Sequence, residues 1–282
     1  MMVNSTLSYF ILSAYIHVGS LKYLYFLLTA ALYLVIIVVN ASLLVVICVN
    51  RSLHEPMYLF LCSLLVNELY GSSGLFPFLL LQILSDVHTV PAPFCFLQIF
   101  CLFTYANVEL CNLAVMSYDR YVAICWPLQY NTHMTFKKTV IFIGVLWLYS
   151  FLKFLITFSL NVRLPLCGNT ISSLYCHNYL VVKLACSDTK VNNIFGLFGT
   201  VLTVLVPLLP ILFSYTKILK ILQSRFDLSD LSAVLRLLLS LYFLLIQPLL
   251  TPVIYGMQMS KIRNGYKSVF SCKTLTRCRD VT

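Results

Sequence analysis

The sequence has few charged residues and no long polar stretch. Charged side chains make up 10% of its 282 residues, whereas hydrophobic ones make up 60%. A soluble domain of this length would not expose so much apolar surface, so the composition indicates an integral membrane protein. The alternating apolar pattern of membrane β-strands is absent as well, which argues against a β-barrel. We therefore expect an all-α membrane protein.

Motifs for metal binding, catalysis and transport are also missing. No Cys-x-x-Cys pair with zinc spacing occurs and the 5 histidines are scattered, so we expect no metal site. No nucleophile–base constellation is present, which argues against an enzyme. No internal repeat links the two halves, which leaves a six-span transporter or channel as a remote alternative. The first twenty residues lack a basic start and a small-residue cleavage site, so no cleavable signal peptide is expected.

What the sequence does contain is a series of long apolar segments. A helix needs about 20 apolar residues to cross the hydrocarbon core of a bilayer. By this measure we predict an N-terminal extracellular tail over residues 1–22, a transmembrane domain over 23–256 and a basic cytoplasmic-type tail over 257–282. The six predicted spans lie near residues 23–49, 57–84, 94–116, 139–160, 194–219 and 233–255.

Basic residues gather in the short loops and in the tail, and the net charge is +10. Beside an anionic leaflet such residues anchor the cytoplasmic face, and we prefer this interpretation to a nucleic-acid surface. Arg51, Lys137, Lys138 and Lys217 fall on one side of the bilayer if the N-terminus is extracellular. Asn4, in an Asn-Ser-Thr triplet, is then a candidate glycosylation site.

Four motifs carry a resemblance to a known family. The run Met116–Cys125 reads MSYDRYVAIC and places a charged pair at a membrane edge, where charge is costly unless it has a function. Leu53–Tyr58 reads LHEPMY, with a proline suited to the first turn of a helix. Ser214–Leu219 reads SYTKIL, and Thr251–Gly256 reads TPVIYG with threonine where the family has asparagine. The chain resembles the olfactory receptors, which are rhodopsin-like G-protein-coupled receptors.

The resemblance implies a rhodopsin-like helix bundle in the plasma membrane. It also implies a small odorant as ligand and a heterotrimeric G protein of the stimulatory type as partner. In such receptors the arginine of the Asp-Arg pair is engaged with its neighbouring aspartate at rest and turns toward the G protein on activation. The residues that match this G-protein switch are Asp119, Arg120, Tyr121, Tyr215 and Tyr255.

Polar residues inside the spans are candidates for function. Glu68 and Glu109 are predicted to form a cation or shared-proton site, with a sodium ion implied by the resemblance; two neutral, hydrogen-bonded acids are the alternative. We interpret Lys153 and Arg236 as snorkelling to the membrane surface. Helical spacing puts Leu102, Ala106, Glu109, Leu113 and Arg120 on one inward stripe. An odorant pocket should be apolar with a few hydroxyl or amide groups, and its predicted lining is Ile99, Leu102, Phe103, Ala106, Asn107, Gly199, Thr200 and Thr203.

The segment 164–189 is predicted to be a long, mostly structureless loop, and three of its residues are cysteines. With Cys95 these make four candidates, for which the sequence alone leaves three pairings open. The resemblance implies the bridges Cys95–Cys176 and Cys167–Cys186. Residues 261–270 are predicted to form a basic amphipathic surface helix, and Cys272 beyond it is a candidate palmitoylation site.

One part of the family pattern is absent after Lys220. Ile221–Ser229 looks like the outer loop before the seventh helix, especially in fish-type receptors. A cytoplasmic loop and the sixth helix, on the order of 40 residues, would then be missing. Six crossings from an extracellular N-terminus would put the basic tail outside, against its charge. The alternative function is therefore a truncated, non-signalling receptor remnant, retained in the endoplasmic reticulum.

Overall fold

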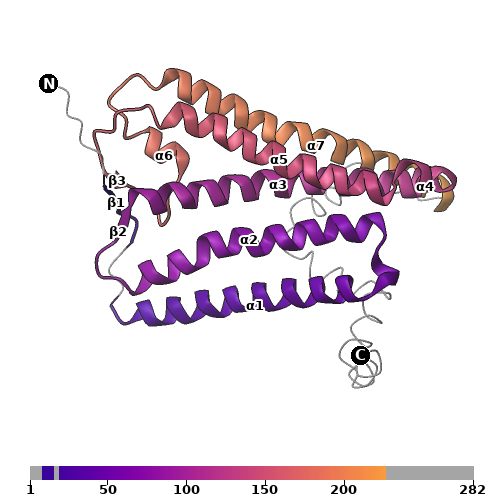
Figure 1. Ribbon diagram of the computed structural model, residues 1–282, viewed down its shortest axis with the longest axis horizontal. Helices are drawn as coiled ribbons and strands as arrows, with labels where there is room; N and C mark the ends of the chain where they lie inside the picture. The colour runs from indigo at the N-terminus through magenta and orange to yellow at the C-terminus, as the bar shows by residue number, and fades with distance from the viewer. Residues whose placement is uncertain (1–7, 16–18, 227–282) are drawn as a thin grey trace, which may run out of the picture. The chain divides into compact units, whose positions relative to one another are not determined.

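The computed structural model describes residues 8–15 and 19–226 of the chain. Five helices in these residues are long and apolar enough to cross a membrane, and they coincide with the first five predicted spans. The sixth predicted span, 233–255, lies outside the described residues. The chain is thus an all-α, multi-pass membrane protein. Figure 1 labels its spanning helices, which are α1 (Leu21–Val49), α2 (Pro56–Leu84), α3 (Ala92–Cys125), α5 (Phe136–Asn161) and α7 (Lys190–Phe226).

Two of the helices are longer than their apolar spans. Helix α3 continues past Met116 to Cys125, so the Asp-Arg pair lies within a helix. Helix α7 continues to Phe226, and the prediction of an outer loop over Ile221–Ser229 is wrong for its helical part. The reason is that hydropathy marks where a helix leaves the apolar medium. Lys, Gln and Arg favour helix, so the backbone hydrogen bonds continue beyond that point.

Side chains next to the spans define where two helices begin. Thr135 Oγ1 accepts a hydrogen bond from the backbone N–H of Lys138 at 3.4 Å, directly before α5. Asp188 Oδ1 accepts one from the N–H of Lys190 at 2.9 Å, where α7 starts. Both satisfy N–H groups that have no partner within their helix. The short turns between the spans are η1 (Arg51–Leu53), η2 (Pro127–Gln129) and α4 (Tyr130–His133).

The chain divides into two compact units, and the long helices contribute one stretch to each. We call the first the disulfide unit, because it holds both cysteine bridges, and the second the Asp-Arg unit, because it holds Asp119 and Arg120. The disulfide unit comprises Met1–Ile36, Glu68–Val108 and Trp147–Val204. The Asp-Arg unit comprises Ile37–Asn67, Glu109–Leu146 and Leu205–Thr282.

A small sheet of order β2-β1-β3 closes one part of the disulfide unit. No strand was predicted in the N-terminal tail, yet β1 (Tyr9–Leu12) pairs antiparallel with β2 (Thr89–Pro91) and parallel with β3 (Thr170–Ile171). Alternation along β1 buries Phe10 and Leu12. The long loop holds β3 and α6 (Asn178–Val182), so it is more ordered than predicted. The buried cluster beneath comprises Phe10, Leu12, Val90, Cys95, Ile99, Phe154, Ile171, Cys176 and Val181.

The core of the Asp-Arg unit lies between α1, α2 and α3. Tyr58 is its largest fully buried side chain. Buried positions on α2 recur at helical spacing, as Leu61, Leu64 and Leu65 show, so one face of the helix is apolar and packed. The cluster comprises Leu43, Val46, Ile47, Leu53, Met57, Tyr58, Phe60, Leu61, Leu64, Leu65 and Met116.

Candidate functional site

Both predicted disulfide bridges are formed. Cys95 and Cys176 join the start of α3 to the long loop with a Cα–Cα separation of 5.4 Å. Cys167 and Cys186 close the loop on itself at 5.3 Å. The backbone N–H of Cys176 also donates to Gln98 Oε1 at 2.8 Å. The loop is therefore held to α3 by a covalent bond and by a buried hydrogen bond next to it.

The residues predicted to bind an odorant belong to the disulfide unit. Lys153, which was not predicted to be one of them, contacts several of them. The Lys153 amino group donates to Asn107 Oδ1 at 2.9 Å, to the Gly199 carbonyl oxygen at 3.2 Å and to Thr203 Oγ1. It also lies 5.5 Å from the centre of the Phe103 ring. The interpretation of Lys153 as snorkelling is wrong, because its amino group turns inward between α3 and α7.

The other predicted pocket residues differ in burial. Asn107 is 3% exposed and Ile99 is 5% exposed, whereas Leu102 is half-buried. Ala106 and Thr200 are exposed, and the Thr200 hydroxyl donates to Gly196 within its own helix. The structure thus gathers Phe103, Asn107, Gly199 and Thr203 around Lys153 and does not bring the remaining residues to the same point. The predicted inward stripe on α3 holds at Glu109 and Leu113 and is wrong at Ala106.

A sequence signal for the orientation of Lys153 exists. Ser150, Lys153 and Thr157 are three and four positions apart, so they share one face of α5. Ser150 is fully buried in the structure, and Thr157 donates to the Lys153 carbonyl at 3.0 Å. A polar stripe on an apolar helix indicates a face turned toward other helices, because lipid offers its hydroxyl groups no partners.

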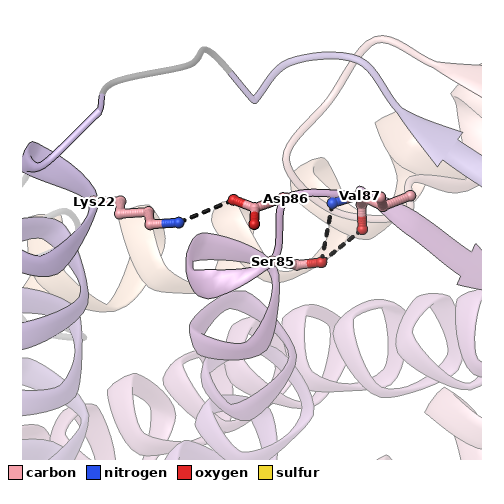
Figure 2. A network of polar contacts seen from close by, with 4 residues as sticks. All are labelled: Lys22, Ser85, Asp86 and Val87. Atoms are coloured by element: carbon pink, nitrogen blue, oxygen red, sulfur yellow. Dashed lines mark hydrogen bonds and ion pairs between the residues drawn. The ribbon is translucent and has the colours of Figure 1, made fainter.

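A separate cavity of about 740 Å³ lies in the same unit, near the start of α1 and the end of α2. None of its lining residues was predicted to bind the odorant. Tyr15 stacks on His88 with ring centres 4.4 Å apart and donates to the Leu174 carbonyl at 2.8 Å. Burial raises the pKa of Tyr15 to about 12. Asp86 and Lys22 both line this cavity, and Figure 2 shows the ion pair between them, at 2.9 Å.

The two intramembrane glutamates have different partners. Glu68 accepts hydrogen bonds from the Tyr105 hydroxyl at 3.4 Å within the disulfide unit. Glu109 Oε2 accepts one from Asn67 Nδ2 at 3.1 Å within the Asp-Arg unit. Because the two carboxylates belong to different units, the cation site predicted for Glu68 and Glu109 stays a prediction.

The Asp-Arg pair lies near the end of α3. Asp119 is 1% exposed and accepts a hydrogen bond from the Tyr130 hydroxyl at 2.8 Å. Within residues 8–15 and 19–226, no ion pair within 4.0 Å joins Asp119 to Arg120, and the resting contact between them stays a prediction. The Tyr121 ring lies 5.6 Å from that of Phe213 on α7.

Several predicted sites lie wholly or partly outside the described residues. Tyr215 is half-buried on α7, but Tyr255 lies outside the described residues, so their joint role in a switch stays a prediction. The same holds for glycosylation at Asn4, palmitoylation at Cys272, the orientation of Arg236 and the surface helix over 261–270.

Comparison with known proteins gives a consistent result. The sequence profile described as "Olfactory receptor" matches residues 29–228. Olfactory receptor 2A12 of Homo sapiens is 37% identical over 143 residues, which are 50% of this chain and 46% of that protein. Olfactory receptor 4E2 of Mus musculus is 41% identical over 143 residues, again 50% of this chain and 46% of the relative. The chain spans about half the length of the curated relatives it matches.

Proposed function

Because the chain belongs to the olfactory receptor family, we propose that it binds small odorants and signals through a heterotrimeric G protein of the stimulatory type. The observation that carries the proposal is the family match over residues 29–228, which includes the Asp-Arg run and the helices with the predicted pocket. We further propose a plasma-membrane location with the N-terminus outside.

The polar groups around Lys153 support the ligand-binding half of this proposal. Asn107 from α3, Lys153 from α5 and Thr203 from α7 converge in one unit. Next to them, the Phe103 ring lies 5.8 Å from that of Phe154. A few converging polar groups beside aromatic surface are what a small, mostly apolar ligand requires.

The charges of the Asp-Arg unit support the proposed orientation. Arg51, Lys137, Lys138 and Lys217 all fall within this unit, as Arg120 does. Basic residues near helix ends favour the cytoplasmic side, where a G protein is found. The cysteine bridges are separate support for an extracellular long loop, because such bridges persist in the oxidising exterior.

Odorant-dependent cAMP in cells that express the chain tests signalling. We expect a response that Arg120→Ala abolishes and that Lys138→Ala, on the same proposed face, leaves in place. If no odorant response occurs, the same experiment is repeated with a sixth helix inserted after Lys220. A response that survives Arg120→Ala would contradict the assigned switch.

Antibody access to a tag after Thr282 tests the predicted absence of one helix. Staining of intact cells would mean that the basic tail lies outside, as six crossings require. Staining only after permeabilisation, with an N-terminal tag accessible outside, would place both termini as in a seven-helix receptor. The second result would contradict the six-span prediction.

A further inference from the structure

The inward amino group of Lys153 identifies the chemical class of the ligand. We propose that Lys153 is a specificity-determining residue and that the chain binds small organic carboxylates, with the carboxylate at Lys153 and an apolar tail along the phenylalanines of α3 and α5. This inference rests on the proposed function, since it names the ligand of the same pocket.

The first support is the position of the amino group. Lys153 lies eight residues before the end of α5 at Asn161, which is about 12 Å along a helix with 1.5 Å rise per residue. A lysine at this depth costs free energy in lipid, so its inward contacts indicate a function rather than an anchor. Asn107, its partner on α3, is itself 3% exposed.

The second support is the polarity of its neighbours. Lysine has three N–H donors and no acceptor. Among the groups that it contacts are the Asn107 amide oxygen, the Gly199 carbonyl and the Thr203 hydroxyl oxygen, and the face of the Phe103 ring lies 5.5 Å away. All of them present a negative pole to the amino group. The polar group at the predicted pocket is therefore a positive donor.

The third support is the exchange of partners that a ligand would make. The Thr203 hydroxyl already donates to the Gly199 carbonyl. It therefore keeps a hydrogen-bond partner when a ligand oxygen takes its place as an acceptor for the Lys153 amino group. A carboxylate oxygen is the stronger acceptor for an ammonium group, because the attraction between opposite charges adds to the hydrogen bond. An alcohol of the same length accepts a hydrogen bond from the ammonium group but brings no opposite charge.

The fourth support is the aromatic surface beside the amino group. The Phe154 ring packs edge-on against Phe103 and Phe100, with ring centres 5.8 Å and 4.9 Å apart. It stacks on Phe158 at 5.6 Å, and Phe96 packs against Phe158 at 5.7 Å. In this proposal a short alkyl chain contacts these rings while its carboxylate reaches Lys153. The ligand class is thus a carboxylate with a small apolar tail.

Direct binding of hexanoate and hexanol to the full chain in lipid nanodiscs tests this inference without a G protein. Ligand-observed NMR supplies the dissociation constants. We expect Lys153→Met to weaken hexanoate binding by about tenfold to a hundredfold and hexanol binding by less than about threefold. Lys153→Arg should restore most of the hexanoate affinity, because a cation is retained. Lys138→Met is the matched control and should change neither constant.

The outcomes separate this inference from the proposed function. Equal loss of both ligands in Lys153→Met, or hexanoate binding that Lys153→Met leaves intact, overturns the inference. Cyclic AMP responses to neutral odorants, with no binding of hexanoate, overturn it while the proposed function stands. Hexanoate binding that depends on Lys153, without any cAMP response, supports the inference and contradicts signalling.

Discussion

The two units of this chain are stabilised by different kinds of contact. The disulfide unit has two covalent bridges, a small sheet and many side-chain hydrogen bonds around Lys153 and Tyr15. The core of the Asp-Arg unit is a continuous cluster of apolar side chains. The first kind of contact builds a surface of defined polarity, whereas the second packs helices that lipid would otherwise separate. The comparison predicts that substitutions and the loss of disulfides change the stability and the hydrogen exchange of the two units differently.

The largest expected effect is the loss of the bridge between α3 and the long loop. Cys95→Ser combined with Cys176→Ser should lower the free energy of unfolding by about 2–4 kcal/mol, since a bridge restricts the unfolded chain. Hydrogen–deuterium exchange should increase first in the peptides of the disulfide unit. Cys48→Ser, at an exposed free thiol, is the control and should change neither quantity. Equal increases of exchange in both units would refute the distinction between them.

Truncation of Phe60 probes the other unit. This side chain is 0% exposed, so Phe60→Ala removes packing from the apolar cluster. We expect a loss of about 2–3 kcal/mol, at the lower end for such changes, because lipid is as apolar as the core. Reduction of the disulfides in this variant should lower the free energy of unfolding further, by the same amount as in the unsubstituted chain. If hydrogen–deuterium exchange increased only in the disulfide unit of the Phe60→Ala variant, the predicted effect on the Asp-Arg unit would be contradicted.

A small enlargement at Gly74 tests close packing within the disulfide unit. A methyl group there would lie 2.7 Å from Cys101 Cβ, so α2 and α3 must move apart. Gly74→Ala should cost about 1–2 kcal/mol in thermal unfolding. Gly196→Ala is the matched control, since nothing lies within 4 Å of the added group. It should be neutral or stabilising, because alanine favours helix over glycine.

The smallest effect is expected at the ion pair of Figure 2. Asp86 is 81% exposed, and solvent screens its contact with Lys22. Lys22→Met should leave the melting temperature unchanged within error. Lys153→Met in the same unit should change it measurably, because Lys153 contacts two other helices. A larger shift at Lys22 than at Lys153 would reverse this order.

The spans and the bridges could be predicted because each has a signal in the sequence. Long apolar runs located five helices, and the family resemblance supplied both disulfide pairings. Helix ends beyond the lipid were missed, since the hydropathy of α7 declines before its hydrogen bonding stops. Strand β1 was missed because four apolar residues in a tail have no periodicity to distinguish them. Its partners are distant in the sequence and cannot be read from local pattern.

The candidate site was predicted in part. Asn107, Gly199 and Thr203 were identified by residue type and helix position, and all three contact Lys153. The inward orientation of Lys153 was missed, although Ser150 and Thr157 place a polar stripe on its face of α5. That stripe indicates the inward face, but the partners of the amino group on α3 and α7 depend on tertiary structure.

The pairing of β1 with β3 also bears on the order of events during synthesis. The hydroxyl of Ser13, just after β1, lies near the carbonyl of Ile171, 158 positions later in the chain. At about 5–20 residues per second, β1 waits on the order of 8–30 s for this partner to be translated. Cys95 likewise waits for Cys176, 81 positions on. The nascent chain therefore carries an open strand edge and an unpaired thiol, and the sheet is completed only after four of the five spanning helices within residues 8–15 and 19–226 have been made.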